Sequence, residues 1–262
     1  MKETVNIFWF RRDLRLDDNA GLYHALKANK PVLLIFIFDE DILDQLPKDD
    51  ARVSFIHKTL QKIKLNLQLN FNSDLSIYYG KPIEVFKELI ANYNIDTVFT
   101  NHDYEPYATK RDTEIANFLG NHGIAFNTFK DHVIFEKNEI VKSDGKPYLV
   151  YTPYMKSWKA LFKNNTQTFY DSYPLLQNAY KNITSPNLSL EDIGFKISNQ
   201  EIKDFQVTSS LIQNYEATRN FPAKASTSRL GPHLRFGTVS IRKIIQKAVA
   251  ESNEVFWQEL IW

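Results

Sequence analysis

The chain has 262 residues with a formal net charge of +1, and 43% of them are hydrophobic. That is enough apolar material for a packed core in one large domain or two. The sequence has no cysteine, which excludes disulfides, thiolate catalysis and a cysteine-built metal site. No leader pattern opens it and no apolar run is long enough to span a bilayer, so we expect a soluble, cytoplasmic protein without a membrane partner.

Strands and helices are predicted to alternate over residues 1–130. The runs 5–10 and 32–38 are continuous and rich in β-branched and aromatic residues, which is typical of strands buried on both faces. Weaker strands are predicted at 75–79, 97–100 and 124–129, and helices at 21–28, 52–69, 82–93 and 107–121. This alternation predicts an α/β fold, a Rossmann-like, doubly wound parallel sheet of five strands.

A sheet of this kind binds ligands at the carboxyl ends of its strands. No G-x-G-x-x-G and no P-loop follows any predicted strand, which argues against a dinucleotide-dependent dehydrogenase and an NTPase. From 131 to 206 the periodicity fades and Pro, Asn, Ser and Asp accumulate, so we expect a long connector with a short helix near 155–162.

The last part of the sequence is predicted to be helical. One helix begins at Arg229 and Gly237 can end it, a second covers 241–250, and a third covers 254–262. The third helix finishes on apolar residues with no cap, so we expect a partial chain.

Positive charge is concentrated in this helical part. Between Tyr215 and Ala250 seven Lys or Arg residues stand against one acid, Glu216, which indicates a polyanionic partner. The basic residues are Arg219, Lys224, Arg229, Arg235, Arg242, Lys243 and Lys247. Hydroxyls at 226–228 precede the predicted helix, and such a helix start binds anions. The alternative is a capped surface helix with solvated charges.

Two separated motifs resemble a known family. The run WFRRDLRLDDN covers 9–19, and Tyr215 is followed by RNFP at 219–222, TSRL at 227–230, LRFG at 234–237 and ELIW at 259–262. Together and in this order they resemble the photolyase/cryptochrome family. The resemblance implies an antenna-type α/β domain at 1–130, an interdomain connector at 131–206 and the start of an all-helical FAD-binding domain at 207–262.

The resemblance implies FAD as the cofactor. Tyr215 would lie against the flavin nucleotide, and Phe256 and Glu259 would lie near the flavin. The phosphate-contacting stretch would consist of Thr227, Ser228, Arg229, Leu230 and Gly231. Many members of the family have serine at the position of Gly231, so one hydroxyl contact is missing here. From residue types alone, without the motif, Tyr215 reads as a packed aromatic.

The resemblance also implies a partner, DNA that contains pyrimidine dimers. Glu259 would hydrogen-bond the lesion, Trp262 would stack against it, and Arg219 would contact the DNA backbone. Glu259 and Trp262, both in the last predicted helix, are three residues apart and so share one face. Without the motif, Trp262 reads as a core residue, Glu259 as a solvated one and Arg219 as a salt-bridge partner of Glu216.

The resemblance is weakest at the antenna site. Tyr107 and Ala108 occupy positions where folate-binding members have Asn and Glu, which argues against folate and leaves a deazaflavin, a second flavin or no antenna open. The 9–19 motif would line the edge of this pocket, although its charges read individually as Arg–Asp pairs. The six histidines lack metal-ligand spacing, and we expect His233 on a helix surface.

The sequence therefore predicts a light-driven DNA repair flavoprotein, a deoxyribodipyrimidine photolyase that splits cyclobutane dimers by electron transfer from excited reduced FAD. We expect a monomer, and we expect that the 262-residue chain alone is inactive. Two alternatives stay open. One is a cryptochrome-type blue-light receptor without repair activity, and the other is a nucleotide-binding α/β sensor module.

Overall fold

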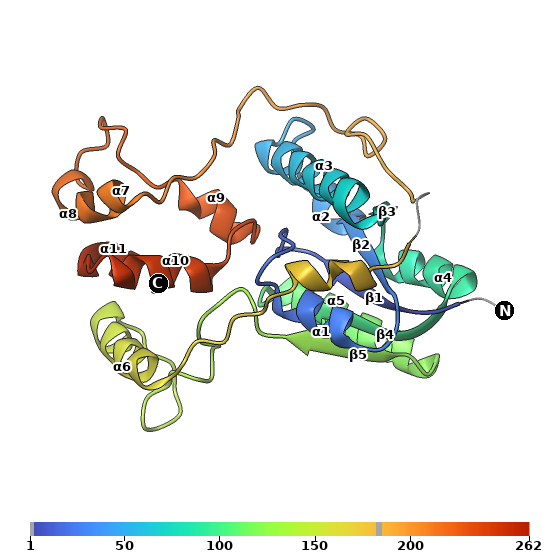
Figure 1. Cartoon of the computed structure of the whole chain (residues 1–262), viewed down its shortest axis with the longest axis horizontal. Helices are drawn as coiled ribbons and strands as arrows, with labels where there is room; N and C mark the ends of the chain where they lie inside the picture. Colours follow the sequence, from blue (N-terminus) through green and yellow to red (C-terminus); the bar gives the residue numbers. More distant parts are fainter. Residues whose placement is uncertain (1–2, 182–184, 262) are drawn as a thin grey trace. The chain divides into compact units, whose positions relative to one another are not determined.

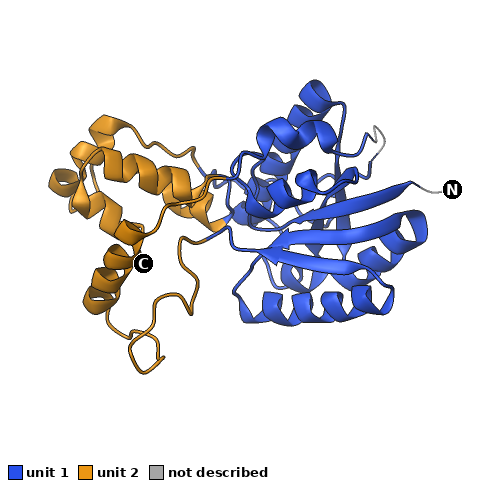
Figure 2. Ribbon diagram, turned by 60° about the horizontal axis from the view of Figure 1, so that its bottom comes forward, with its two compact units in different colours: residues 1–132, 170–202, 236–238 blue, residues 133–169, 203–235, 239–262 orange. Residues whose placement is uncertain are grey.

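The computed structural model describes residues 3–181 and 185–261 and divides the chain into two compact units (Figure 2). Unit 1 contains residues 1–132, 170–202 and 236–238, and unit 2 contains 133–169, 203–235 and 239–262. The segment 131–206, expected to be a connector, is thus shared between the two units. The family-based division into three parts stays a prediction.

Unit 1 is built on a parallel sheet of five strands (Figure 1). The strands are β1 (Thr4–Phe10), β2 (Val32–Asp39), β3 (Leu75–Gly80), β4 (Asn94–Asn101) and β5 (Ala125–Phe129). They lie in the order β3-β2-β1-β4-β5, and every neighbouring pair is parallel. The predicted α/β fold with a doubly wound, five-stranded sheet is confirmed.

Helices cover both faces of this sheet. They are α1 (Ala20–Lys27), α3 (Ala51–Phe71), α4 (Pro82–Asn92) and α5 (Pro106–Asn121), with the short α2 (Glu40–Leu43) and the 3-10 helix η1 (Tyr173–Asn178). Side chains of β1 alternate between the faces: Phe8 packs in the cluster that contains Leu60 of α3, and Trp9 in the one that contains Phe86 of α4. The predicted helices of this unit are confirmed, and α2 and η1 were not foreseen because they have only four and six residues.

A buried ion pair ties the loop after β1 to the end of β5. Arg15 donates from Nη2 to both carboxylate oxygens of Asp131, at 2.8 and 2.7 Å. The side chain of Asp131 is 0% exposed and that of Arg15 is 9% exposed. Asp131 also accepts from the backbone N–H of Ala20, the first residue of α1. One carboxylate therefore fixes the loop, the helix start and the strand end together.

The short segment 236–238 packs onto the same loop. Phe236 is buried in the core, its carbonyl accepts from Leu14 N at 3.0 Å, and the carbonyl of Gly237 accepts from Arg15 Nη1 at 3.1 Å. Gly237 has a φ of +61°, and a Cβ there would lie 2.3 Å from the carbonyl oxygen of Arg12. Only glycine fits this approach.

Unit 2 is helical. Its helices are α6 (Tyr151–Asn164), α7 (Ser209–Gln213), α8 (Tyr215–Thr218), α9 (Leu230–Arg235), α10 (Ile241–Ala250) and α11 (Glu254–Glu259). They surround a core that includes Trp158, Ile245 and Trp257. The prediction of α10 is confirmed residue by residue, with Ser240 accepting from Lys243 N as its cap.

Helix boundaries in unit 2 differ from the prediction in α6, α9 and α11. The helix expected near 155–162 is longer, since α6 covers Tyr151–Asn164. Arg229 has a φ of +55°, so α9 begins one residue later, at Leu230. The helix expected at 254–262 ends at Glu259, because Leu260 N bonds Trp257 O in a tightened last turn. Trp262 lies outside the described residues.

We predict that Asp131→Ala destabilises the protein by about 3–5 kcal/mol, because it leaves the buried guanidinium of Arg15 without its counter-charge. Urea unfolding followed by circular dichroism measures the loss. Glu201→Ala is the control, since it breaks a pair with Lys58 whose side chains are 72% and 62% exposed and costs under about 1 kcal/mol. Equal losses in the two variants would contradict the role given to Asp131.

We predict that Gly237→Ala costs at least about 2 kcal/mol, from the positive φ and the contact with the backbone of Arg12. Gly120→Ala in α5 is the matched control, because a Cβ there meets nothing within 4 Å and alanine favours a helix by up to about 1 kcal/mol. A Gly237→Ala variant with the urea midpoint of the natural protein would refute this account.

Candidate functional site

Four of the predicted site residues come together in unit 2. Arg219 Nη1 lies 2.7 Å from Glu259 Oε1, and the guanidinium carbon of Arg219 lies 5.5 Å from the centre of the Tyr215 ring. The rings of Tyr215 and Phe256 meet edge to face, with their centres 5.1 Å apart. We call these four residues the Arg219 cluster.

Two short helices position the Arg219 cluster. Tyr215 opens α8, and Arg219 follows it by four residues, with its backbone N–H bonded to the carbonyl of Tyr215 at 2.8 Å. Residues four apart in a helix lie on the same side of it. Phe256 and Glu259 of α11, which are three apart, do so as well. Asn253 caps α11 by accepting from Phe256 N at 2.9 Å. The salt-bridge partner of Arg219 is Glu259, and not Glu216 as the sequence alternative supposed.

The phenols around this ion pair stay protonated. Burial raises the pKa of Tyr215, the charge of Glu259 raises it further, and Arg219 opposes this. The same causes, in the same order, raise the pKa of Tyr151 in α6, whose hydroxyl donates to Gln258 O at 2.8 Å. Both hydroxyls are therefore neutral hydrogen-bond donors at physiological pH.

The predicted phosphate-contacting stretch forms a surface loop that leads into α9. Thr227, Arg229 and Gly231 are exposed, and a Cβ at Gly231 would meet open space. Leu230 is buried in the core of unit 2, and the carbonyl of Ser228 accepts from Gln206 N at 2.8 Å. The loop is thus anchored at two points and presents polar groups outward, an arrangement that fits a diphosphate. Among the described residues, no hydrogen bond, ion pair or ring contact joins 227–231 to the Arg219 cluster.

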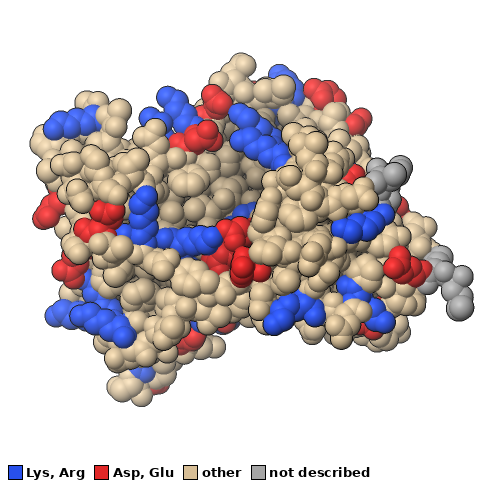
Figure 3. Space-filling view, in the orientation of Figure 1, with Lys and Arg blue, Asp and Glu red and all other residues tan. Residues whose placement is uncertain are grey.

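Two sequence expectations about the basic region need correction. His233 is buried, and its ring N–H donates to the carbonyl of Lys203 at 3.1 Å, so it is not on a helix surface. Arg242 is also buried and adds nothing to a basic surface. With Arg219 paired to Glu259, the region is less basic than its composition indicates. Figure 3 shows Lys and Arg interspersed with Asp and Glu on one face of the molecule.

In unit 1, polar side chains gather where β1 and β2 end. Tyr107 of α5 donates its hydroxyl to both carboxylate oxygens of Asp39, at 2.9 and 2.8 Å. The guanidinium carbons of Arg11 and Arg111 lie 5.1 and 4.9 Å from the ring centre of Trp9. Arg11 is also bonded to the carboxylate of Asp112. The charges of Arg11 and Arg15 are thus paired with aspartates, as their individual residue types indicated.

Asp39 and Arg111 were missed by the sequence reasoning. Burial raises the pKa of Asp39, and the Tyr107 hydroxyl and Arg111 oppose that rise. Burial and the Asp39 carboxylate in turn raise the pKa of Tyr107 above its usual value. A signal was present, because Asp39 is the last residue of the buried strand β2 and so lies at its carboxyl end, where parallel sheets place ligand-binding groups.

Comparison with known proteins assigns the family. The profile of the DNA photolyase family matches residues 6–172. The chain belongs to the DNA photolyase family. It is 30% identical to the deoxyribodipyrimidine photo-lyase of Halobacterium salinarum, over 95% of this chain and 56% of that one. It is 32% identical to an uncharacterized 31.6 kDa protein of Synechococcus sp. (strain PCC 6716), over 93% of this chain and 89% of that one.

Solved structures of this family share the fold. A class III photolyase from Agrobacterium tumefaciens superposes with a TM-score of 0.82 at 25% identity and covers 100% of this chain and 58% of its own. A photolyase from Sulfolobus tokodaii, described with two FAD molecules, gives 0.74 at 24% identity, over 98% of this chain and 57% of its own. Cryptochrome-1 of Arabidopsis thaliana is 24% identical over 95% of this chain and 39% of that one. The chain spans a little more than half the length of the curated photolyases it matches.

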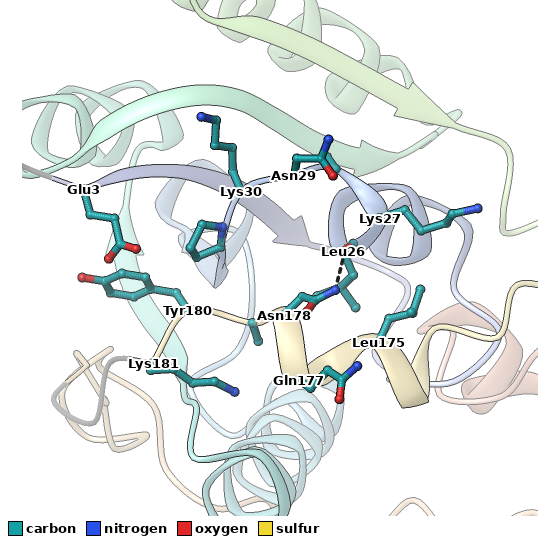
Figure 4. Close-up of a pocket in the computed structure, with 13 residues that line it drawn as sticks. Glu3, Leu26, Lys27, Asn29, Lys30, Leu175, Gln177, Asn178, Tyr180 and Lys181 are labelled. Carbon is teal, nitrogen blue, oxygen red and sulfur yellow. Dashed lines mark hydrogen bonds between the residues drawn. The ribbon is translucent and has the colours of Figure 1, made fainter.

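Unit 1 of this photolyase-family chain also has a pocket, which lies at the amino ends of β1 and β2 (Figure 4). Its volume is about 800 Å³, and Lys27, Lys30 and Lys181 stand at its rim. Lys27 is bonded to the hydroxyl of Tyr23, and Lys181 to the carbonyl of Phe71. The ammonium groups of Lys27 and Lys30 point away from the hollow in Figure 4, so the polar groups do not converge on one point.

Among residues 3–181 and 185–261, none of the helices combines the length and the apolar composition that a membrane span requires. No group of three or more His, Cys, Asp or Glu residues that could hold a metal ion is found among the same residues.

We predict that Tyr107→Phe destabilises the protein by about 1–2 kcal/mol at pH 7, because Asp39 loses the hydroxyl donor and keeps only the backbone N–H of Asp41 and the more distant Arg111. The variant raises the pKa of Asp39 further, and a carboxylate whose folded pKa is raised loses stability as the pH rises through it. The deficit therefore shrinks as the pH falls from 7 toward 3.8, the ordinary pKa of aspartate. Urea unfolding across this range measures it.

Tyr79→Phe is the matched control. Tyr79 is 39% exposed and Tyr107 is 38% exposed, but no aspartate accepts a hydrogen bond from Tyr79 among the described residues. A deficit for Tyr107→Phe that does not change with pH, or an equal one for Tyr79→Phe, would contradict the assignment.

Proposed function

We propose that this chain serves in a deoxyribodipyrimidine photolyase, a flavoprotein that uses blue light to split cyclobutane pyrimidine dimers in DNA. The observation that carries the proposal is the Arg219 cluster, in which an aromatic pair, a cation and a carboxylate from two helices lie side by side in a chain of this family. A flipped-out lesion needs aromatic surface, a polar group that reads the base and a cation for the backbone.

FAD is the cofactor of this proposal. The loop 227–231 would take its diphosphate on the hydroxyls of Thr227 and Ser228 and on its backbone N–H groups, with the guanidinium of the exposed Arg229 as a counter-charge. Tyr215 and Phe256 would supply aromatic surface for the flavin nucleotide. When bound, reduced and excited FAD supplies the electron that splits the dimer. Support comes from the outward polar groups of this loop and from the photolyase of Sulfolobus tokodaii, which is described with FAD.

Damaged DNA is the proposed partner. Arg219 would contact a backbone phosphate, because its side chain is 33% exposed and carries five donors. Glu259 would hydrogen-bond the dimer, and the predicted stacking residue Trp262 lies outside the described residues. We further propose a monomer in the cytoplasm. We also propose an antenna that is not a folate, because Tyr107 and Ala108 stand where folate-binding members of the family have Asn and Glu, and the hydroxyl of Tyr107 is bound to Asp39.

A cryptochrome-type receptor is the second candidate, and it is favoured by the similarity to Cryptochrome-1. It would bind the same flavin and leave dimers intact. The sensor-module alternative gains no support from unit 1, since the lysines at its pocket of about 800 Å³ do not converge.

The test is a repair assay on the product of the complete gene. With reduced FAD and blue light, we expect dimers in a short oligonucleotide to be split, and no splitting in the dark. Bound flavin with intact dimers under light would support the cryptochrome alternative. Because the chain spans 56–58% of the curated photolyases, we keep the prediction that the 262-residue chain alone leaves dimers intact. Splitting by that chain would refute it.

A further inference from the structure

We propose that Arg219 and Glu259 form a latch that DNA opens. In the free protein the guanidinium of Arg219 is paired with Glu259. A backbone phosphate of bound DNA replaces Glu259 as the partner of Arg219, and the carboxylate then hydrogen-bonds the lesion. This inference rests on the proposed function and goes beyond it, because it makes two site residues partners of each other before they are partners of DNA.

The ion pair is accessible enough to be exchanged. The two side chains are 33% and 47% exposed, and their closest atoms are 2.7 Å apart. Ion pairs at such exposure add little to stability, since water screens them, so a competing anion displaces the carboxylate easily. The structure shows one carboxylate oxygen of Glu259 on the guanidinium, at 2.7 Å, whereas a phosphate can offer the planar guanidinium two oxygens.

The backbone of Arg219 is fixed by a hydrogen bond, while its guanidinium remains partly exposed to solvent. Its backbone N–H is bonded to Tyr215 O, and its guanidinium lies over the Tyr215 ring, which Phe256 supports edge to face. The cation–π contact with the Tyr215 ring thus keeps the guanidinium in the site when its ion pair with Glu259 is broken. Glu259 sits at the end of α11, where it is half exposed.

The latch has a consequence for selectivity. While the pair is closed, the carboxylate cancels the charge of Arg219 and repels phosphate, so undamaged DNA binds weakly at this point. A dimer offsets the free energy of breaking the ion pair, because the released carboxylate then accepts hydrogen bonds from the lesion. Undamaged DNA breaks the same pair but gives Glu259 no such hydrogen bonds, so the ion pair favours damaged over undamaged DNA.

The test measures the affinity of the full chain for a short oligonucleotide, with and without one thymine dimer, by fluorescence anisotropy at fixed salt. We expect Glu259→Gln to tighten binding of undamaged DNA on the order of 3- to 10-fold, because Arg219 is released. In the Arg219→Gln background the same change gives less than about 2-fold, which is the coupling that a double-mutant cycle isolates. Glu259→Gln also lowers the preference for the dimer.

Glu216→Gln is the matched control, because it removes the same charge from α8, three residues before Arg219, without breaking the pair. We expect less than about 2-fold from it. Equal gains from Glu216→Gln and Glu259→Gln would show a net-charge effect and overturn the latch. A gain that persists without Arg219 would overturn it as well.

A spectroscopic measurement follows the cation itself. The Nε–Hε resonance of Arg219, assigned through its loss in Arg219→Lys, is expected to move on addition of undamaged DNA toward its position in Glu259→Gln. A resonance that stays in place while the oligonucleotide is bound refutes the latch and leaves the proposed function standing. If neither the natural protein nor any variant binds either oligonucleotide, the proposed function fails and the latch fails with it.

Discussion

The buried pair between Arg15 and Asp131 is the contact on which the arrangement of unit 1 depends. A carboxylate without exposure is stable only when its charge is matched and its oxygens are bonded, and here a guanidinium and the N–H of Ala20 meet both needs. Since these groups come from the loop after β1, the start of α1 and the end of β5, the pair fixes three chain segments at once. The carbonyl of Gly237 joins a fourth to the same guanidinium.

The ion pair of unit 2 obeys the same electrostatics with the opposite outcome. Arg219 and Glu259 are at a similar distance to each other as Arg15 and Asp131, yet they are half exposed. Burial makes the first pair costly to break, and solvent makes the second one exchangeable. Unit 1 therefore uses an ion pair as a permanent tie, whereas the Arg219 cluster of unit 2 holds charged groups that a ligand can claim.

Many of the strands and helices were predictable from the local sequence. The runs 5–10 and 32–38 indicated buried strands, and the helix predicted at 241–250 has the same bounds as α10. The boundary of α9 was missed because Arg229 adopts a positive φ, which few non-glycine residues do and which no local pattern announces. Helices of one turn, such as α8, carry too few residues for any periodicity.

The candidate site divides along the same line. Tyr215, Arg219, Phe256 and Glu259 were named from sequence, but the partner of Arg219 was not, because Glu216 is near in sequence and Glu259 is near only in space. For the same reason no local pattern indicated that His233 is buried against Phe205 and Lys203. Asp39 and Tyr107 are 68 residues apart, and only the packing of α5 against the sheet edge makes them a hydrogen-bonded pair.

The strands, the longer helices and the family could be inferred from the amino-acid sequence, because hydrophobic periodicity and residue order are local properties of the chain. Which charges meet depends on the fold, since an ion pair or a buried hydrogen bond is formed by segments that folding brings together from distant positions. That is why Arg15 with Asp131 is a structural tie and Arg219 with Glu259 an exposed one, although all four residues look alike in the sequence.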